Sequence, residues 1–236
     1  MKTAYHRVVL KISGEALAGS KGTGFDFDFI SSVCRTVKEA AEAGVQIGIV
    51  IGGGNFWRGV KDGAGKVERV SADRMGMLAT CMNCLAVCDV LRQLGTRARV
   101  MTSVDIMGVG ERYDTRKAIE YMEGGEVVLF AGGTGAPFFS TDTAAALRAA
   151  EIHADAILLA KNIDGVYSAD PRKDPEAVKF DRISYDEVLA RRLAVMDSTA
   201  TSLAMDNEIP VIVFALAEPE NILRVLRGEA VGTTVE

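Results

Sequence analysis

The sequence predicts an α/β protein of three layers, in which helices cover both faces of a mainly parallel sheet. Short apolar runs rich in Val, Ile and Leu alternate with longer amphipathic runs along the 236 residues. Such apolar runs are typical of strands covered on both faces, and strand–helix alternation gives parallel strands joined by right-handed crossovers. Glycine-rich loops follow three of the apolar runs, which favours a binding crevice at the carboxyl ends of the strands.

Each expected strand is bounded by glycine or charged residues. The strands are residues 8–12, 45–51, 98–102, 127–131, 156–160 and 210–214. Amphipathic periodicity predicts helices at 28–43, 72–94, 115–122, 143–152, 185–189, 199–206 and 219–227. Residues 161–181 contain Asp-Gly and Asp-Pro pairs and are expected to form an excursion from the sheet. No shift in composition divides the chain, so one domain spanning residues 1–236 is expected.

The composition argues against a nucleic-acid-binding, membrane-bound or secreted protein. Acidic residues outnumber basic ones by 32 to 27, giving a net charge of -5, and there is no dense basic block to attract nucleic acid or an anionic membrane. No apolar run approaches the roughly 20 residues that span a bilayer, and Lys11 and Glu15 interrupt the start of the chain, unlike a signal peptide. With 4 cysteines and no N-x-[ST] sequence, a cytoplasmic location with reduced thiols is expected.

Three cysteines, Cys81, Cys84 and Cys88, include one C-x-x-C spacing that could indicate zinc or a redox pair. The chain has no second C-x-x-C, and His6 and His153 are its only histidines, so no set of four zinc ligands is visible. Offsets of three and seven residues place the three thiols on one stripe of a helix. We therefore expect them to pack in the interior.

The glycine loops after the strands are the first candidate binding elements. They are Ser13-Gly14, the run from Gly52 to Asn55, and the sequence AGGTGAPFFSTD at 131–142. Glycine lets backbone N–H groups approach an anion without obstruction by Cβ, and a following helix N-terminus adds positive potential. No G-x-G-x-x-G occurs, and the near match around Gly63–Lys66 lacks the first glycine and the Ser/Thr of a P-loop. The glycine loops thus predict a phosphate-binding site that uses neither of these two motifs.

Charged side chains near these loops suit phosphoryl transfer, which requires cations over the moving phosphate oxygens. Lys11 lies inside an apolar strand and would be costly to bury without an anionic partner; an edge-strand lysine reaching solvent is the alternative. Arg58 follows the triple-glycine loop and is a second candidate cation, although a surface arginine fits the sequence nearly as well. Asp142 follows Ser140 and Thr141, and it could cap a helix, orient magnesium or a lysine, or do both.

Several longer motifs occur together in one order along the chain. They are KISGEAL at 11–17, VIGGGNFWRG at 50–59, ADRMGMLAT at 72–80, GTGAPFFSTD at 133–142, NIDGVYSADP at 162–171 and VMDSTA at 195–200. Through these motifs the chain resembles, nearly from end to end, the bacterial uridylate kinases (UMP kinases) of the amino acid kinase superfamily. The resemblance implies the amino acid kinase-like fold and the reaction ATP + UMP to ADP + UDP, with magnesium, in pyrimidine nucleotide synthesis.

The resemblance also implies roles at the matching positions. Lys11 and Arg58 would stabilise the transferring phosphoryl group, and Asp142 and Asp197 would organise Lys11 and magnesium; the individual metal ligands stay open. Asp73 would bind the ribose hydroxyls of UMP, with a helix-start cap as the alternative. The implied ATP-binding residues are Lys11, Ile12, Ser13, Gly14, Gly54, Arg58, Lys161, Asn162, Tyr167 and Asp170. The implied UMP-binding residues are Gly53, Asp73, Thr134, Gly135, Ala136, Pro137, Phe138, Phe139, Ser140 and Thr141.

Regulation and assembly are implied in the same way. GTP is the expected activator and UTP the expected inhibitor, and a homohexamer built as a trimer of dimers is the expected assembly. The region linked to GTP consists of Gly19, Ser20, Lys21, Gly22, Thr23 and Gly24. One departure is Lys161-Asn162, where many relatives have a Thr-Lys-like pair, so the contacts with ATP there stay open.

Two other functions stay open on the sequence alone. A different kinase of the superfamily would phosphorylate a carboxylate or carbamate, but the chain has no room for the domains often appended to such kinases. Asp73 and the 133–142 motif also favour a nucleotide acceptor. A non-catalytic nucleotide- or oxyanion-binding homologue would keep the fold, and the retention of Lys11, Arg58, Asp142 and Asp197 argues against it.

Overall fold

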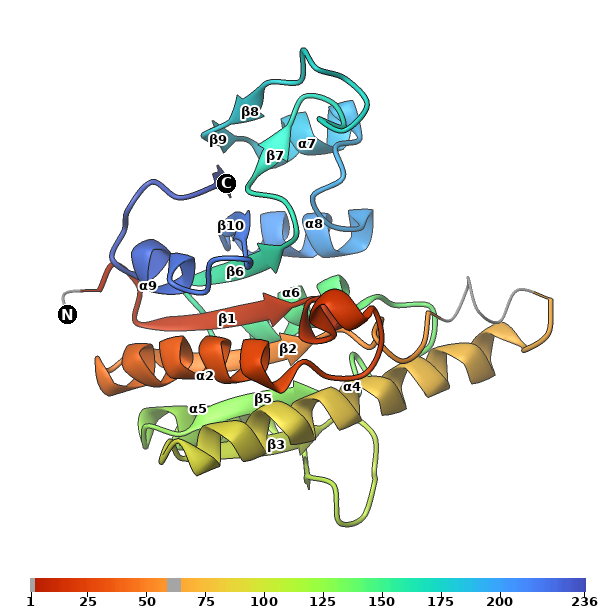
Figure 1. Cartoon of the computed structure of the whole chain (residues 1–236), viewed down its shortest axis with the longest axis vertical. Coiled ribbons are helices and arrows are strands. Elements are labelled where there is room, and N and C mark those ends of the chain that lie inside the picture. The colour runs from red at the N-terminus through yellow and green to blue at the C-terminus, as the bar shows by residue number, and fades with distance from the viewer. Residues whose placement is uncertain (1–2, 59–64) are drawn as a thin grey trace.

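The computed structural model describes residues 3–58 and 65–236. Within these residues the main sheet has nine strands in the order β4-β3-β5-β2-β1-β6-β10-β11-β9 (Figure 1). The pairing between β10 and β11 is antiparallel, and the other neighbours pair in parallel. The strands are β1 (Arg7–Ile12), β2 (Gln46–Ile51), β3 (Ala98–Thr102), β4 (Glu111–Arg112), β5 (Val127–Ala131), β6 (Ala156–Lys161), β9 (Arg182–Ile183), β10 (Val211–Ala215) and β11 (Thr233–Val235).

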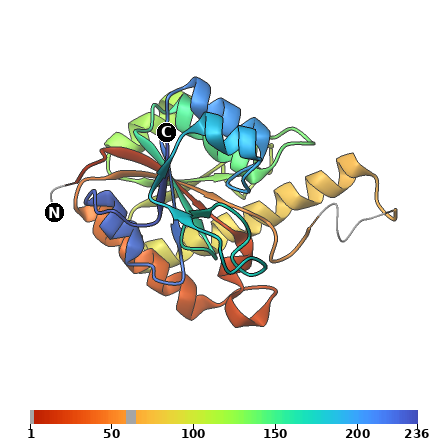
Figure 2. The same cartoon turned by 90° about the horizontal axis from the view of Figure 1, so that it is seen from above.

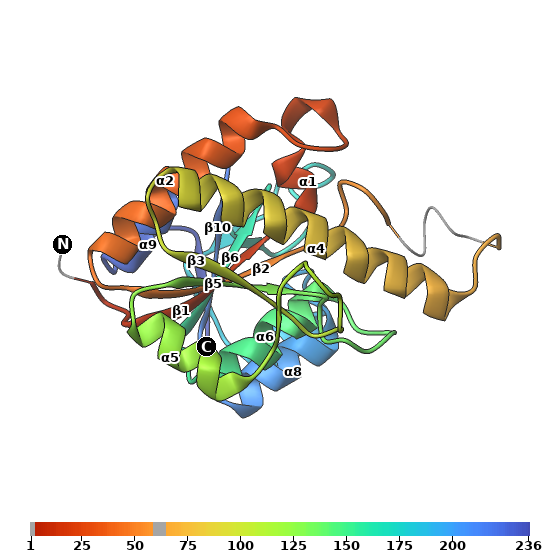
Figure 3. The same ribbon diagram turned by 90° about the horizontal axis from the view of Figure 1, so that it is seen from below.

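Helices cover both faces of this sheet, as Figures 2 and 3 show. One face packs against α2, α4 and α9, and the other against α5, α6, α7 and α8. The helices are α1 (Gly14–Leu17), α2 (Phe27–Glu42), α4 (Arg69–Gln93), α5 (Thr115–Glu123), α6 (Thr141–Glu151), α7 (Tyr185–Arg191), α8 (Ser198–Asp206) and α9 (Asn221–Leu226), with a 3-10 turn at Gly19–Lys21. The predicted three-layer arrangement around a mainly parallel sheet is confirmed.

The apolar runs form strands because both of their faces are covered. Every residue of β5 is buried, and in β1 and β2 only the first residue is partly exposed. Polar caps fix where the helices begin: the Asp26 carboxylate accepts a hydrogen bond from the backbone N–H of Phe29 at the start of α2. Alternation of strand and helix therefore places the long strands side by side, with their carboxyl ends at one edge.

The six predicted strands are present to within one residue at each end. The five short strands were not predicted, because two or three residues carry too little periodicity to be recognised. Two of these, β7 (Val166–Tyr167) and β8 (Lys179–Phe180), form a separate antiparallel hairpin, which confirms the expected excursion at 161–181. Two helices begin earlier than predicted, α4 at Arg69 and α6 at Thr141.

Helix α4 is the longest element, with 25 residues, and its N-terminal end projects beyond the sheet (Figures 1 and 3). Its length and composition alone would suit a membrane span. However, 56% of its apolar 18-residue stretch is buried inside the protein, as in a core helix. Cys81, Cys84 and Cys88 are buried on its inner face, as expected. The three thiols belong to the hydrophobic core on that face of the sheet, which fits the expected packing role.

Candidate functional site

The three glycine loops meet at the carboxyl ends of β1, β2 and β5. A Cβ on Gly14 would lie 2.3 Å from the carbonyl oxygen of Gly52, and a Cβ on Gly52 would lie 3.4 Å from Thr141 Oγ1. Only glycine permits the first of these approaches. The expected common crevice is therefore built from loops that touch one another.

A buried amide pair that the sequence analysis missed holds the middle loop in place. Asn83 on α4 donates from Nδ2 to the Gly52 carbonyl at 2.6 Å and to Asn55 Oδ1 at 2.8 Å. Asn55 Nδ2 in turn donates to Asn83 Oδ1 and to the Gly24 carbonyl, both at 2.9 Å. These buried bonds fix the backbone of the glycine loop, and no local sequence pattern reveals a partner 28 residues away.

Lys11 and Asp142 form an ion pair at the centre of the crevice. The Lys11 Nζ and Asp142 Oδ1 atoms are 2.5 Å apart, and the two side chains are only 10% and 18% exposed. Strand β1 lies between β2 and β6, so the edge-strand alternative for Lys11 is wrong. Ser140, not Asp142, caps α6, because its Oγ accepts from the N–H groups of Asp142 and Thr143 at 3.0 and 3.1 Å. The Asp142 carboxylate thus faces the lysine.

Asp197, implied as a second acidic residue of the site, lies at the start of α8. Its carboxylate caps α8 by accepting from the N–H of Ala200 at 3.0 Å. It also accepts from Thr143 Oγ1 at 3.1 Å and from Ser140 Oγ. Asp197 therefore ties the start of α8 to the start of α6.

A cavity of about 750 Å³ opens on one side of this pair. It extends from β1 and β6 to the hairpin and to the segment that follows α7. Of the residues implied for ATP, it is lined by Lys11, Ser13, Lys161, Asn162, Tyr167 and Asp170, together with Asp142. Ile12, Gly14, Gly54 and Arg58 are not among its described lining residues. Arg172, Arg191 and Arg192 also line the cavity, and they were not predicted.

Lys161 is the most deeply placed cation of this cavity after Lys11. Its Nζ donates to the Val195 carbonyl. Burial lowers the pKa of Lys161 below its usual value; Asp142 opposes this decrease, and Lys11 adds to it. Two lysines and one aspartate therefore share the end of the cavity where phosphate groups would lie, and a bound anion would relieve the repulsion between the lysines.

Arg58 lies on the other side of the Ser13-Gly14 turn. Its Nη2 is 2.9 Å from Glu15 Oε1, and its Nε donates to the Gly54 carbonyl at 3.3 Å. Both charged side chains are about two-fifths exposed, 41% for Arg58 and 44% for Glu15. An exposed pair of this kind holds its members weakly.

A second cavity lies between the first turns of α4 and the 132–141 loop. Of the residues implied for UMP, it is lined by Gly53, Asp73, Thr134, Phe139, Ser140 and Thr141. Trp57, whose Nε1 donates to the Ala72 carbonyl at 2.8 Å, forms part of the wall. Gly135, Ala136, Pro137 and Phe138 belong to the loop without lining the cavity. The N-cap of α4 is Glu68, so the helix-start alternative for Asp73 is wrong.

The segment implied for GTP, 19–24, packs beside the middle glycine loop. Thr23 Oγ1 and the Gly24 N–H donate to the Asn55 carbonyl at 2.8 and 3.3 Å. Lys21, its one cation, donates from Nζ to the Phe25 carbonyl at 3.2 Å. The segment is mostly exposed and contributes to none of the cavities described here.

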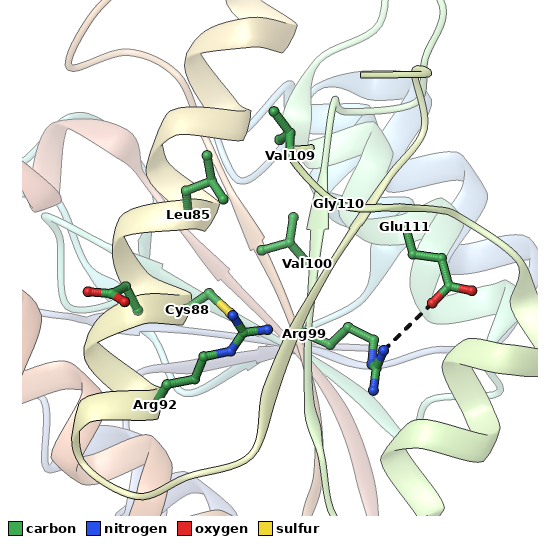
Figure 4. A pocket seen from close by; sticks show the side chains of 9 residues that line it. Leu85, Cys88, Arg92, Arg99, Val100, Val109, Gly110 and Glu111 are labelled. Carbon is green, nitrogen blue, oxygen red and sulfur yellow. Dashed lines mark ion pairs between the residues drawn. The ribbon is translucent and has the colours of Figure 1, made fainter. Parts of the chain in front are cut away.

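A separate cavity of about 370 Å³ lies between α4 and the β3–β4 edge, away from the crevice (Figure 4). Arg92 and Cys88 reach it from α4, and Arg99 reaches it from β3. Arg99 is paired with Glu126 at 3.1 Å and lies 3.8 Å from Glu111. No motif in the sequence pointed to these arginines.

Comparisons with known proteins agree with this architecture. The model of the amino acid kinase family matches residues 6–215. A uridylate kinase of Limosilactobacillus reuteri is 54% identical over 233 residues, which are 98% of this chain and 97% of the relative.

Solved structures lead to the same family. The structure of a UMP kinase from Bacillus anthracis has a TM-score of 0.95 at 37% identity, covering 98% of this chain and 96% of that one. The structure of a UMP kinase from Ureaplasma parvum has a TM-score of 0.93 at 34% identity, covering the whole of both chains. The chain therefore belongs to the uridylate kinases of the amino acid kinase family.

Proposed function

We propose that the protein transfers the γ-phosphoryl group of ATP to UMP, giving ADP and UDP. The observation that carries the proposal is the position of the Lys11–Asp142 pair between two cavities. One cavity is lined by residues implied for ATP, and the other by residues implied for UMP. Asp142 lines the first, and its neighbours Ser140 and Thr141 line the second. Two phosphate groups entering from the two sides would meet at Lys11, as in-line transfer requires.

The proposed donor site uses cations and backbone N–H groups. Lys11 and Lys161 would contact ATP phosphates, with Lys11 on the transferring group, and Arg58 would leave Glu15 to reach the same charge. The Ser13-Gly14 turn and Gly54 would supply N–H groups, next to Ile12. Tyr167 and Asp170, with Asn162, would hold the adenosine end. Charge developing on the moving oxygens would thereby face fixed positive groups.

The proposed acceptor site holds UMP by its phosphate and its sugar. Gly53 and the N-terminus of α6 would bind the phosphate, since a helix N-terminus favours anions. Asp73 would accept hydrogen bonds from the ribose hydroxyls. The loop residues Thr134, Gly135, Ala136, Pro137, Phe138 and Phe139 would enclose the base and sugar, with Ser140 and Thr141 next to the phosphate.

Magnesium is proposed to enter with ATP. The largely buried Asp142 carboxylate contacts Lys11 Nζ through Oδ1 at 2.5 Å, and in the described part of the chain no cluster of three metal-binding side chains surrounds it. Mg²⁺ commonly uses one or two carboxylates together with substrate phosphates and water, so the residues fit a metal carried by the nucleotide. When bound, the metal would neutralise phosphate charge. Asp197 would act through Ser140 and Thr143 by holding the start of α6.

The proposal extends to domain organisation, location and assembly. The nine-stranded sheet draws its strands from Arg7 to Val235, and we propose that residues 1–236 form a single domain. The four cysteines are free and buried, which supports a cytoplasmic location. We also propose a homohexamer built as a trimer of dimers. An exposed apolar stripe on α4, consisting of Met75, Leu78, Met82 and Leu85 at 40%, 52%, 44% and 41% exposure, supports self-association.

Regulation by GTP as activator and UTP as inhibitor is likewise a proposal. The 19–24 segment packs on the middle glycine loop, so a ligand there would act on the crevice directly. The cavity of Figure 4, with Arg92 and Arg99, offers a second place for an anionic effector. To distinguish the 19–24 segment from this cavity, activity is measured against GTP concentration for Lys21→Met and for Arg92→Met. The variant that loses activation by GTP identifies the region where GTP binds.

The proposed reaction is tested by coupled ADP release with UMP, CMP, aspartate, glutamate and carbamate as acceptors. We expect turnover with UMP. Turnover with aspartate and none with UMP would identify a carboxylate kinase of the same superfamily. Binding of ATP and UMP by calorimetry without any turnover would identify a non-catalytic homologue.

A further inference from the structure

We propose that Arg69 is a positioning residue for the acceptor: with the backbone N–H of Phe138, it fixes the Asp73 carboxylate in the orientation that accepts the ribose hydroxyls. The inference rests on the proposed function, because it requires that Asp73 binds the ribose of UMP. No motif in the sequence singled out Arg69. Arg69, Asp73 and Phe138 are called the ribose clasp below.

Arg69 and Asp73 lie one turn apart at the start of α4 and form an ion pair. Arg69 Nε is 2.9 Å from Asp73 Oδ1 and 2.7 Å from Oδ2, so one N–H is shared between both oxygens. The Asp73 side chain is 15% exposed, whereas that of Arg69 is 45% exposed. The carboxylate is therefore held against the cavity wall from the solvent side.

The third member of the clasp comes from the loop that encloses the same cavity. The backbone N–H of Phe138 donates to Asp73 Oδ2 at 2.8 Å. Phe138 has a φ of 71°, a left-handed conformation that is unfavourable for a bulky residue and persists only where its surroundings hold it. The guanidinium carbon of Arg69 lies 5.1 Å from the centroid of the Phe138 ring, within range of a cation–π contact. Arg69 thus contacts both other members.

The clasp leaves acceptor capacity on the carboxylate. A carboxylate offers two oxygens with about four lone-pair sites. The shared N–H of Arg69 and the N–H of Phe138 converge on Oδ2 and leave Oδ1 with only the weaker share of one bond. Asp73 lines the cavity together with Gly53 and Thr134. The unused lone pairs can accept the two vicinal hydroxyls of a ribose, and a 2′-deoxyribose would leave one of them without a donor.

The clasp is important for the orientation of the Asp73 carboxylate more than for the stability of the fold. An ion pair as exposed as that of Arg69 contributes little to folding. A hydrogen bond from substrate to a charged group contributes more, provided that the group is already in place. Loss of the Arg69 side chain should therefore raise the KM for UMP and weaken the preference for ribose over 2′-deoxyribose. The KM for ATP should change little.

Steady-state kinetics of Arg69→Met with UMP and with 2′-deoxy-UMP test this inference. We expect the KM for UMP to rise about tenfold and the ratio of kcat/KM between UMP and 2′-deoxy-UMP to fall several-fold. The KM for ATP and the kcat should stay within about twofold of wild type. Arg69→Lys, which keeps the charge, should recover part of both effects. The control is Arg74→Met, an exposed arginine on the same helix, which should match wild type.

Three results would overturn the inference. An unchanged KM and an unchanged ribose preference would show that Arg69 has no role in the acceptor site. A lower KM for UMP would show that Arg69 competes with the substrate for Asp73. An equal rise in KM for both nucleotides, with a lower melting temperature, would show a purely structural role. Failure of the wild-type protein to phosphorylate UMP would instead overturn the proposed function, and with it the clasp.

Discussion

The Nζ atom of Lys11 lies 2.5 Å from Oδ1 of Asp142, where β1 ends and α6 begins. Both side chains are largely removed from water, so each ion depends on the other for compensation of its charge. The pair also lies between the two cavities. One contact therefore serves both the stability of the fold and the placement of a cation at the proposed reaction centre.

Substitution of Lys11 tests its proposed part in the reaction. In Lys11→Met we expect kcat to fall by about 10²–10³, the range found when one preorganised group facing transition-state charge is removed. The KM for UMP should change little, because the acceptor cavity lies on the other side of Asp142. Initial rates at saturating ATP and UMP measure this effect, and an unchanged kcat would exclude Lys11 as the stabilising cation.

A double-mutant cycle tests the structural part of the same contact. Lys11→Met and Asp142→Leu each leave one partly buried charge without its partner, and each should lower the free energy of unfolding by about 2–4 kcal/mol. The double variant should lose less than the sum of the two, because neither charge is then left alone. Urea unfolding of the four proteins measures the coupling. Strict additivity would mean that the two ions do not stabilise one another.

Gly14→Ala tests whether the loops of the crevice need their close approach. The added Cβ would lie 2.3 Å from the Gly52 carbonyl oxygen and 2.7 Å from Asn55 Oδ1. Because this overlap is with backbone, the loops must shift, and we expect a loss of roughly 1–3 kcal/mol in stability.

Gly76→Ala is the matched control for Gly14→Ala. A Cβ there has no neighbour closer than Trp57 Cδ1 at 3.9 Å. In a helix interior, alanine is more stable than glycine by about 0.5–1 kcal/mol. Thermal unfolding should therefore show a lower melting temperature for Gly14→Ala and an equal or higher one for Gly76→Ala. Equal decreases for both would contradict the argument from loop contact.

The long strands could be predicted because their residues are buried on both faces, which leaves an apolar run in the sequence. The short strands β4 and β9 have two residues each, and only contacts with distant neighbours define them. The glycine loops and Lys11 were recognisable for a different reason: each departs from the composition of the neighbouring residues at a fixed place in the strand–helix alternation.

Other parts of the site depend on contacts that no local pattern encodes. Asp197 meets Ser140 across 57 residues, so its use as a tether could not be foreseen. The Arg69–Asp73 spacing is one that helices use for ion pairs, but the predicted helix began at 72 and left Arg69 outside. The left-handed conformation of Phe138 follows from its neighbours in space, and the sequence around it contains no sign of it.

The apolar stripe on α4 gives a prediction about assembly. Leu78→Glu combined with Met82→Glu places two charges in the middle of the stripe. If the stripe is an interface between copies of the chain, burying these charges is costly, and the dissociation constant of the assembly should rise at least about tenfold. Sedimentation velocity at several concentrations measures the change.

Val178→Glu provides the control for the stripe variant, because Val178 is 64% exposed and directly precedes β8, which lies far from α4 in Figure 1. It should sediment like the wild type. A stripe variant with an unchanged sedimentation coefficient would show that these side chains do not form a contact between subunits, and the proposed hexamer would then require a different surface.

The lowered pKa of Lys161 predicts how the use of ATP depends on pH. Burial disfavours the charged form, so Lys161 loses its proton at a lower pH than an ordinary lysine. If the charged form binds ATP phosphates, kcat/KM for ATP should fall on the alkaline side as Lys161 becomes neutral. Arginine stays charged throughout this range, so Lys161→Arg should move the alkaline decrease to higher pH.

The comparison needs a control, since other groups also titrate at high pH. Lys38→Arg changes a lysine on α2 whose Nζ donates to the Leu94 carbonyl at the C-terminal end of α4, and Lys38 lines neither cavity of the crevice. Its pH profile should coincide with that of the wild type. The profile of kcat/KM, rather than kcat, is the one to compare, because it reports the free enzyme, in which bound phosphate has not yet raised the pKa of Lys161. Identical alkaline limbs for wild type and Lys161→Arg would mean that Lys161 does not contact ATP in its charged form.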